Sequence, residues 1–255
     1  MTNMLHATNV HKQFGDKQQQ HTALRGIELK VDTGEFVGIM GPSGAGKTTL
    51  LNVISTIDQP TSGEVFINGQ NIVGLSEKEL SRFRREQLGF IFQDYNLLNA
   101  LTVRENIALP LALARLNARE IEQRVYDTSL KLGIQDLLDK YPYQISGGQK
   151  QRCAASRALV TQPKLIFADE PTGALDSTSA TGLLDQLKTI NEQDGATILM
   201  VTHDAFAASY CQRIAIIKDG EVFKEIQKGS STRKQFFDRI LQTMAEVGGA
   251  DHDLV

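Results

Sequence analysis

The sequence predicts an α/β fold whose core is interrupted by an inserted helical piece. The apolar run Phe36–Met40 has the length of a buried strand, and a glycine-rich turn leads from it into helical apolar spacing over residues 48–57. Residues 96–158 then have a helical texture. Strand-type apolar runs return after this stretch, at residues 164–168, Thr197–Val201 and 214–217.

The composition is that of an ordinary globular protein. Hydrophobic side chains make up 41% of the 255 residues and charged side chains 22%. The formal charge of -3 disfavours a chain built mainly to hold nucleic acid, so we expect no nucleic-acid partner. Cys153 and Cys211 lack metal-ligand spacing, and we expect them to be small packing residues in a reducing cytosol.

Neither a secretory leader nor a membrane span is expected. Residues 1–13 are polar and contain no apolar segment of the kind a signal peptide needs. The most apolar stretch, residues 107–116, is broken by Pro110 and Arg115 and falls short of the roughly 18 apolar residues that cross a bilayer.

Two local patterns predict elements outside the central strands. Asn68-Gly69 follows the apolar run 64–67 and predicts a tight hairpin turn, because these residues tolerate the positive φ of a type I′ turn. Residues 232–247 have an apolar face and predict a docked terminal helix. The residues expected on that face are Phe236, Phe237, Ile240, Leu241 and Met244.

Residues 41–48 fit the phosphate-loop pattern G-x-x-x-x-G-K-[ST] at every position. Glycines allow backbone N–H groups to close around phosphate oxygens, and the following helix adds its positive end. Lys47 would supply a charge to the phosphates, and Thr48 a hydroxyl to Mg²⁺. The candidate nucleotide contacts are Gly41, Pro42, Ser43, Gly44, Ala45, Gly46, Lys47, Thr48 and Thr49.

A second apolar strand ends in two carboxylates, Asp169 and Glu170. Adjacent residues of a strand point to opposite sides, so one acid can reach a metal while the next faces an attacking water. We therefore expect Asp169 to bind Mg²⁺ and Glu170 to polarise the water.

Ser146-Gly147-Gly148-Gln149 precedes an Arg- and Ala-rich helical stretch, residues 150–159. A serine and two glycines at a helix start form a phosphate-binding device, or an ordinary helix-capping loop. The pattern alone leaves both interpretations open.

Taken in order, these segments resemble the ATP-binding cassette (ABC) family of ATPases over residues 5–228. Residues 145–149 resemble the family's signature motif, with Ile145 where Leu is usual. Gln93, within 89–94, resembles the glutamine of the Q-loop. Residues 173–176 resemble the D-loop, with Gly173 where Ser is typical. Two single residues complete the set: Phe14 resembles the aromatic residue that stacks on adenine, where Tyr is commoner, and His203 resembles the switch histidine.

The resemblance implies a P-loop (RecA-like) ABC ATPase core with an antiparallel β subdomain and an inserted α-helical subdomain at about 95–158. The ATPase domain would span residues 1–228, and a C-terminal amphipathic helix and tail would span 229–255. The catalytic residues would be Glu170, His203, Gln93 and Lys47, and the Mg²⁺ ligands Thr48, Gln93 and Asp169. The further ATP contacts would be Phe14, Ser146, Gly147, Gly148, Gln149 and Asp176.

The resemblance also implies partners. ATP would be sandwiched between two copies of the chain, with Ser146 and Gly148 of one copy reaching the γ-phosphate held by Lys47 of the other. A separate integral membrane permease, at the cytoplasmic face of the cell membrane, would receive the work of closure and hydrolytic opening. The apolar-rich stretch 95–101 would be either a docking surface for that permease or packing between subdomains.

Several segments are similar to one branch of the family, the ATPases of the bacitracin-resistance (Bce-type) peptide-antibiotic transporters of Gram-positive bacteria. The similar segments are residues 90–98, 145–152, 167–177, 202–204, 207–211 and 236–237. This likeness implies resistance to, or sensing of, bacitracin or lantibiotic-type peptides, with a sensor kinase as a further partner through the permease.

Other functions within the superfamily remain open. The alternatives are a macrolide-exporter, lipoprotein-release or cell-division type ATPase with another membrane partner, or a non-transport ATPase for DNA repair or ribosome work. Long coiled coils, zinc sites or a fused second ATPase, which are usual in non-transport members, are not visible. The basic run Arg82, Arg84 and Arg85 is expected to be a solvated helix face.

Overall fold

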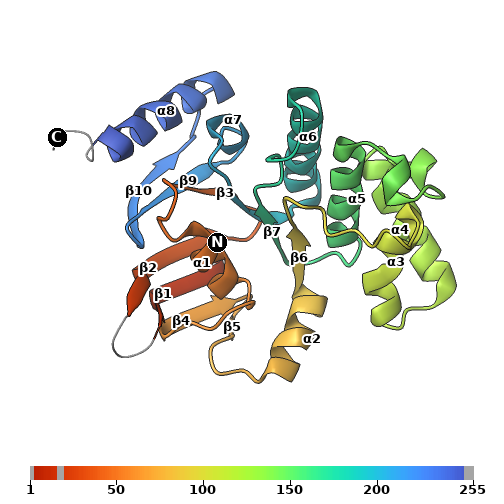
Figure 1. Ribbon diagram of the computed structural model, residues 1–255, viewed down its shortest axis with the longest axis horizontal. Coiled ribbons are helices and arrows are strands. Elements are labelled where there is room, and N and C mark those ends of the chain that lie inside the picture. The colour runs from red at the N-terminus through yellow and green to blue at the C-terminus, as the bar shows by residue number, and fades with distance from the viewer. Residues whose placement is uncertain (1–2, 16–19, 250–255) are drawn as a thin grey trace.

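A six-stranded sheet forms the centre of the protein (Figure 1). The computed structural model describes residues 3–15 and 20–249. The strand order is β10-β9-β3-β8-β7-β6, and all neighbouring pairs are parallel except the antiparallel pair β9-β10. The strands are β3 (Phe36–Met40), β6 (Leu88–Ile91), β7 (Leu165–Asp169), β8 (Thr197–Val201), β9 (Arg213–Lys218) and β10 (Glu221–Gln227).

A second, antiparallel sheet has the order β2-β1-β4-β5. Its strands are β1 (Asn3–Phe14), β2 (His21–Asp32), β4 (Ser62–Ile67) and β5 (Gln70–Asn71). Asn68 and Gly69 join β4 to β5 with φ of 49° and 77°, which confirms the predicted hairpin turn.

Both faces of the central sheet are buried. In β7, Ile166 and Ala168 pack into one apolar cluster, while Leu165 and Phe167 pack into another on the opposite face. The strands β3 and β8 divide their side chains between the same two clusters. Burial on both sides explains why these strands are short, continuous apolar runs in the sequence.

Four helices flank the sheets: α1 (Lys47–Ile54), α2 (Glu77–Gln87), α6 (Ser177–Asp194) and α7 (Ala205–Ala208). Helix α1 ends three residues before the predicted end at residue 57. The chain turns at Thr56, whose φ of 67° is left-handed, and Ile57 is left exposed. In α2, Arg82 and Arg85 are exposed, as expected of a solvated helix face, and Arg82 pairs with Glu86. Arg84 departs from this expectation, because it is half-buried and donates to the carbonyl oxygen of Thr56 as well as pairing with Glu77.

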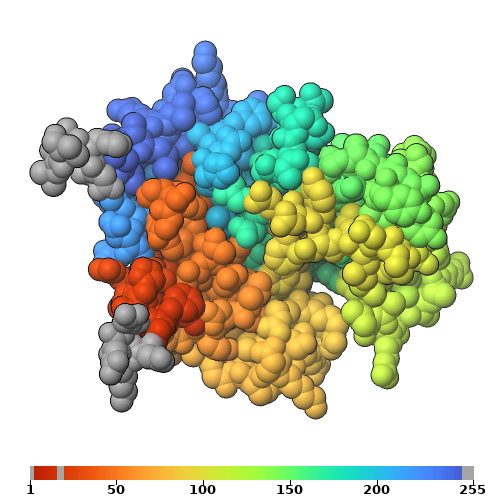
Figure 2. All heavy atoms as spheres, in the orientation of Figure 1, coloured from red at the N-terminus to blue at the C-terminus, as the bar shows by residue number. Residues whose placement is uncertain are grey.

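The helical lobe forms one side of the molecule and is drawn in green in Figure 2. It consists of α3 (Val103–Leu113), α4 (Ala118–Lys131), the 3₁₀ turns Gln135–Leu137 and Pro142–Gln144, and α5 (Gly147–Leu159). The helical texture predicted from residue 96 therefore becomes helix only at Val103. Buried Asn106 holds the preceding loop by donating to the carbonyls of Leu98, Leu101 and Thr102.

The last helix, α8 (Arg233–Gly249), lies along the edge of the central sheet (Figure 1). Phe236 and Ile240 are fully buried in the same apolar cluster as one face of the sheet, and Phe237 and Met244 pack partly against it. The predicted docked helix is thus confirmed, but Leu241 is 47% exposed and lies outside the buried face. Val247 is buried in the same apolar cluster and extends the buried face toward the end of the helix.

Cys153 and Cys211 are buried, which confirms that they are packing residues. Burial raises the pKa of the Cys153 thiol to about 12, so this group stays protonated at neutral pH. No helix in the described part of the chain has the length and apolarity to cross a membrane.

Candidate functional site

The phosphate loop connects β3 (Phe36–Met40) to α1 (Lys47–Ile54), and close backbone packing requires glycine at Gly41 and Gly46. A Cβ at Gly41 would lie 2.1 Å from the carbonyl oxygen of Ile217, and one at Gly46 would lie 2.6 Å from that of Ala23. Gly46 precedes α1 with a left-handed φ of 98° and gives the helix no side-chain cap. The first N–H groups of α1 are therefore left for an anionic ligand.

The ammonium group of Lys47 rests on its own loop. Its Nζ atom donates to the carbonyl oxygens of Gly41, at 2.9 Å, and Pro42, at 2.8 Å. Burial lowers the pKa of Lys47, and the nearby carboxylates of Glu170 and Asp169 oppose that shift. The lysine thus lies between the loop and the acidic strand end, where a phosphate could take over its hydrogen bonds.

The two acids differ in how the backbone presents them. Strand β7 ends at Asp169, and burial together with the neighbouring Glu170 raises the pKa of Asp169, which Lys47 partly offsets. Glu170 lies beyond the strand with a φ of 45°. Strand alternation, on which the sequence argument relied, therefore does not separate the two side chains: a left-handed backbone residue does.

Glu170 is engaged by His203. Its Oε1 atom accepts from the backbone N–H of His203 at 3.1 Å and lies 2.9 Å from the ring Nδ1. An ionised carboxylate can only accept, so Nδ1 carries the hydrogen in this pair. The His203 side chain is 72% exposed and that of Glu170 17%, so the acid is sheltered and the histidine faces outward.

The signature residues lie at the start of α5 and pack against α6. Ser146 caps α5: its Oγ accepts from the N–H of Gln149, whose side chain in turn accepts from the Ser146 N–H. A Cβ at Gly148 would lie 2.5 Å from Ser179 Oγ, and one at Gly147 would lie 3.1 Å from Tyr95 Oη. Close approach to α6 therefore requires glycine at Gly148, whereas at Gly147 the neighbouring Tyr95 side chain would have to move by a few tenths of an ångström.

The D-loop and the Q-loop meet beside this helix start. Asp176 caps α6 by accepting from the backbone N–H and the hydroxyl of Ser179. A Cβ at Gly173 would lie 3.1 Å from the amide of Gln93, so the small residue in place of the usual Ser leaves room for that glutamine. Gln93 therefore lies against the D-loop.

The predicted residues form two groups. Lys47, Asp169, Glu170 and His203 interact at the carboxyl ends of β3, β7 and β8. Gln93, Asp176 and the signature residues gather where the helical lobe meets α6. Phe14 belongs to neither: it ends β1, is 44% exposed, and has Lys12 Nζ 5.0 Å from its ring centroid.

The donors available for Mg²⁺ are hard oxygen ligands. Among the described residues, no cluster of three His, Cys, Asp or Glu side chains could hold a metal ion. In phosphoryl-transfer sites, however, Mg²⁺ commonly takes one or two carboxylates together with substrate phosphates and water. The hydroxyl of Thr48, the carboxylate of Asp169 and the amide oxygen of Gln93 are chemically suited to such a role.

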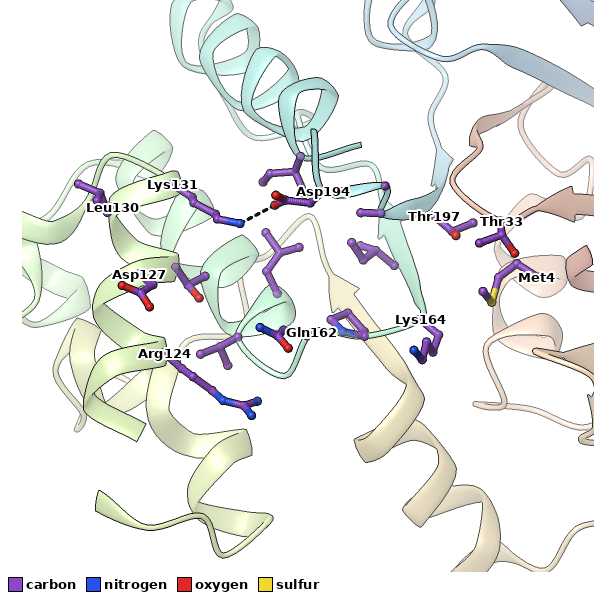
Figure 3. Close-up of a pocket in the computed structure, with 18 residues that line it drawn as sticks. Met4, Thr33, Arg124, Asp127, Leu130, Lys131, Gln162, Lys164, Asp194 and Thr197 are labelled. Atoms are coloured by element: carbon purple, nitrogen blue, oxygen red, sulfur yellow. Dashed lines mark hydrogen bonds and ion pairs between the residues drawn. The ribbon is translucent and has the colours of Figure 1, made fainter. Parts of the chain in front are cut away.

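The cleft in Figure 3, of about 820 Å³, lies at the opposite end of the central strands from these candidate residues. Lys164 precedes β7 and Thr197 begins β8, so the cleft is at the amino ends of strands whose carboxyl ends carry the site. Lys131 of α4 pairs across it with Asp194 of α6 at 2.6 Å. The cleft is thus separate from the candidate nucleotide residues.

Sequence reasoning missed three residues that tie these loops together: Tyr95, Gln151 and Arg157. Tyr95 lies close to Gly147, and Leu97 packs partly against the core, so part of the stretch 95–101 is packing between subdomains. Leu98, in contrast, is 48% exposed. Of these three, only Gln151 had a usable signal in the sequence. It is a polar residue close to the apolar run Cys153, Ala154 and Ala155, which indicates a buried polar contact.

Comparison with known proteins agrees with this geometry. A family model described as "ABC transporter" matches residues 24–173, which include the phosphate loop, the signature and the acidic strand end. The chain belongs to the ABC transporter family. This ABC ATPase is 51% identical to the bacitracin export ATP-binding protein BceA of Halalkalibacterium halodurans, over 98% of this chain and 99% of the relative.

Two further likenesses extend the comparison. The dimeric post-hydrolysis state of the ATP-binding cassette MJ0796 of Methanocaldococcus jannaschii, bound to ADP and Pi, matches with a TM-score of 0.81 and 40% identity, over 88% of this chain and 98% of that chain. The macrolide export ATP-binding/permease protein MacB of Campylobacter jejuni is 42% identical, over 94% of this chain and 36% of that protein. The predicted ABC ATPase fold and ATPase activity are confirmed.

Proposed function

We propose that this ABC ATPase powers a separate membrane permease that protects its host against bacitracin or lantibiotic-type peptides, or senses them. The observation that carries the proposal is the 51% identity to a bacitracin export ATP-binding protein over nearly the full length of both chains. The chain would act at the cytoplasmic face of the membrane through the permease. A sensor kinase would be reached through that permease as well.

We propose that two copies of the chain complete each ATP site. The uncapped start of α1 offers its N–H groups to the phosphates, whereas the start of α5 lies with the D-loop of its own chain. A second copy would therefore bring its Ser146 and Gly148 to the γ-phosphate held by Lys47, with the positive end of α5 adding to the attraction. The dimeric cassette bound to ADP and Pi supports this arrangement.

Each residue of the core group has a proposed role in hydrolysis. Lys47 would leave the carbonyls of Gly41 and Pro42 to bind the β- and γ-phosphates. Glu170 would accept a proton from the attacking water, and His203, already bonded to it, would hold that carboxylate in place. The sheltered position of Glu170 suits a base that must keep its orientation.

The remaining residues would bind ATP and Mg²⁺. Thr48, Asp169 and Gln93 would hold the metal, which neutralises phosphate charge when bound. Phe14 would stack on adenine, and Gly147, Gln149 and Asp176 would line the nucleotide at the interface of the two copies. Residues 1–228 would form the ATPase unit, and residues 229–255 an appended helix and tail.

A second candidate function has support of its own. The 42% identity to a macrolide export ATP-binding/permease protein favours a permease of that wider class, which would leave another cargo possible. A lipoprotein-release or cell-division role belongs to the same alternative, whereas a non-transport role has no comparable support.

Growth assays would test the proposal. Strains with the wild-type gene, a deletion and Glu170→Gln are challenged with bacitracin, a lantibiotic and a macrolide. We expect the deletion and Glu170→Gln to be equally sensitive to the cell-wall peptides, because a permease needs hydrolytic opening as well as closure. Unchanged peptide sensitivity with macrolide sensitivity would replace the first function by the second, and a failure of division or lipoprotein sorting would point to the remaining members of that class.

A further inference from the structure

One side chain of the signature helix α5 contacts both the Q-loop and the segment that follows the acidic strand β7. Gln151 lies in α5 and is fully buried. Its Nε2 atom donates to the carbonyl oxygens of Phe92, at 3.1 Å, and Pro171, at 2.7 Å. Phe92 directly precedes Gln93, and Pro171 directly follows Glu170. A single amide group therefore joins α5, the Q-loop and the exit from the acidic strand.

The chemistry of this contact requires a primary amide. A carboxamide nitrogen carries two hydrogens and can donate to two carbonyl oxygens at once. A glutamate would place acceptor against acceptor, and a methionine of similar length would leave both carbonyls without this donor. Within the described part of the chain, Gln151 Oε1 has no hydrogen-bond partner, so both hydrogen bonds of this side chain come from its donor end.

A second side chain of α5 fixes the Q-loop beyond Gln93. Arg157 donates from Nη1 to the carbonyl oxygen of Asn96, at 2.6 Å, and from Nη2 to that of Tyr95, at 2.9 Å. Tyr95 and Asn96 have φ of 60° and 48°, an uncommon left-handed pair that a surrounding structure must hold. Figure 1 shows this segment running from β6 to the helical lobe.

We propose that Gln151 is a positioning residue for ATP hydrolysis, because its amide ties the neighbours of Gln93 and Glu170 to the signature helix and so fixes where these two side chains lie. Arg157 is a second tie, from the same helix to the loop that follows Gln93. The inference rests on the proposed roles of Gln93 and Glu170. Since neither tie touches the phosphate loop, their loss slows turnover while ATP binding is retained.

The test compares purified wild-type protein, Gln151→Met and the matched control Gln123→Met. Gln123 is an exposed glutamine of α4 whose side chain donates to Asp127 on the same helix, so its variant should behave as wild type. For Gln151→Met we expect kcat to fall on the order of tenfold, as a misplaced reacting group would cause. The KM for ATP should stay within about twofold, because the phosphate loop is untouched.

Two further readouts separate positioning from general loosening of the fold. Hydrogen exchange should quicken at the amides of residues 93–96 and 172–173 in Gln151→Met, but not in β3 or α1. In a double-mutant cycle, Gln93→Ala and Gln151→Met together should cost less than the product of the two single losses, because Gln151 acts in part through Gln93. An unchanged kcat, or losses that simply multiply, would overturn the inference.

Arg157→Lys keeps the test decisive if Gln151→Met does not fold. Arg157 is half-buried, and lysine keeps the charge but loses the fork that bonds both carbonyls. The same selective fall in kcat is expected, and a wild-type kcat would overturn the inference. Glu170→Gln distinguishes this result from a failure of the proposed function: rapid turnover by that variant would refute the catalytic assignment itself.

Discussion

The phosphate loop and the start of α5 are both glycine-containing helix starts, but they are held in different ways. Helix α1 follows Gly46 without a side-chain cap, and backbone from two other strands fixes its loop. Helix α5 is capped by Ser146 and Gln149, and side chains of the Q-loop and of α6 lie against its start. The first is thus a rigid site with donors left for a ligand, whereas the second is tied to the loops around Gln93 and Asp176.

We infer from this difference that nucleotide binding and the timing of hydrolysis would depend on separate parts of the molecule. An anion entering the phosphate loop meets donors that need no rearrangement, apart from the Lys47 side chain. The start of α5 can change position only with the Q-loop and D-loop that contact it. Variants in the core group should therefore abolish chemistry, and variants at α5 should alter when chemistry occurs.

The largest expected effect is that of Glu170→Gln, which tests the core side of this comparison. An amide cannot accept the proton of the attacking water, so kcat should fall by about 10²–10⁴-fold, while ATP still binds. Steady-state ATPase assays and nucleotide titration measure the two quantities. Glu192→Gln, which removes the exposed pair with Lys188, is the matched control and should leave both unchanged. Turnover of Glu170→Gln near that of the control would refute the assigned base.

An intermediate effect is expected for Gly148→Ala, which tests the α5 side. The new Cβ would meet Ser179 Oγ at 2.5 Å, and that hydroxyl is held by Asp176, so the helix start must shift. We expect ATP hydrolysis to slow on the order of tenfold with the nucleotide affinity of the single chain retained.

Gly182→Ala in α6 is the matched control for this variant. Its Cβ would find Arg152 Nη1 only at 3.9 Å, so alanine should stabilise the helix by about 0.5–1 kcal/mol. Melting temperature and ATPase rate are measured for both glycine variants. Equal ATPase rates in the two variants would mean that the close approach of α5 to α6 does not affect ATP hydrolysis.

The smallest expected effect is on folding stability, which is lowered because Asp169 is buried beside the phosphate loop. Burial and Glu170 raise the pKa of Asp169, so its charged form is disfavoured by folding. Without nucleotide or Mg²⁺, Asp169→Asn should raise Tm by about 2 °C at neutral pH. The gain should disappear as the pH falls below the ordinary aspartate pKa, because the carboxyl group is then protonated in both states. A gain that is independent of pH would contradict this origin.

The two regions also differ in how well the sequence predicts them. The phosphate loop and the acidic strand end are contiguous patterns whose local structure follows from glycine placement and apolar runs, and the fold class follows from their order. The hairpin at Asn68 and the docked helix around Phe236 were predicted for the same reason.

Tertiary contacts set the features that the sequence left undetermined. The backbone of Glu170 donates to the carbonyl oxygen of Val201 and accepts from the N–H of Gly173, and these bonds hold its left-handed conformation. Strand alternation therefore gave the wrong reason for the direction of the side chain. The contacts of Gln151 could not be predicted, because the two carbonyl oxygens to which it donates are distant in sequence. Leu241 fits the apolar spacing of α8 but faces away from the sheet.

Mixing two defective chains tests most directly whether the phosphate loop of one copy and the signature residues of a second copy bind the same ATP. All chains carry Glu170→Gln to hold ATP, one variant adds Lys47→Ala, and the other adds Ser146→Glu, whose carboxylate would repel the γ-phosphate. Light scattering distinguishes the 28.1 kDa monomer from its dimer. We predict that ATP dimerises neither variant alone but does dimerise the mixture, which can build one intact site. A mixture that stays monomeric while the Glu170→Gln parent dimerises would contradict the composite site.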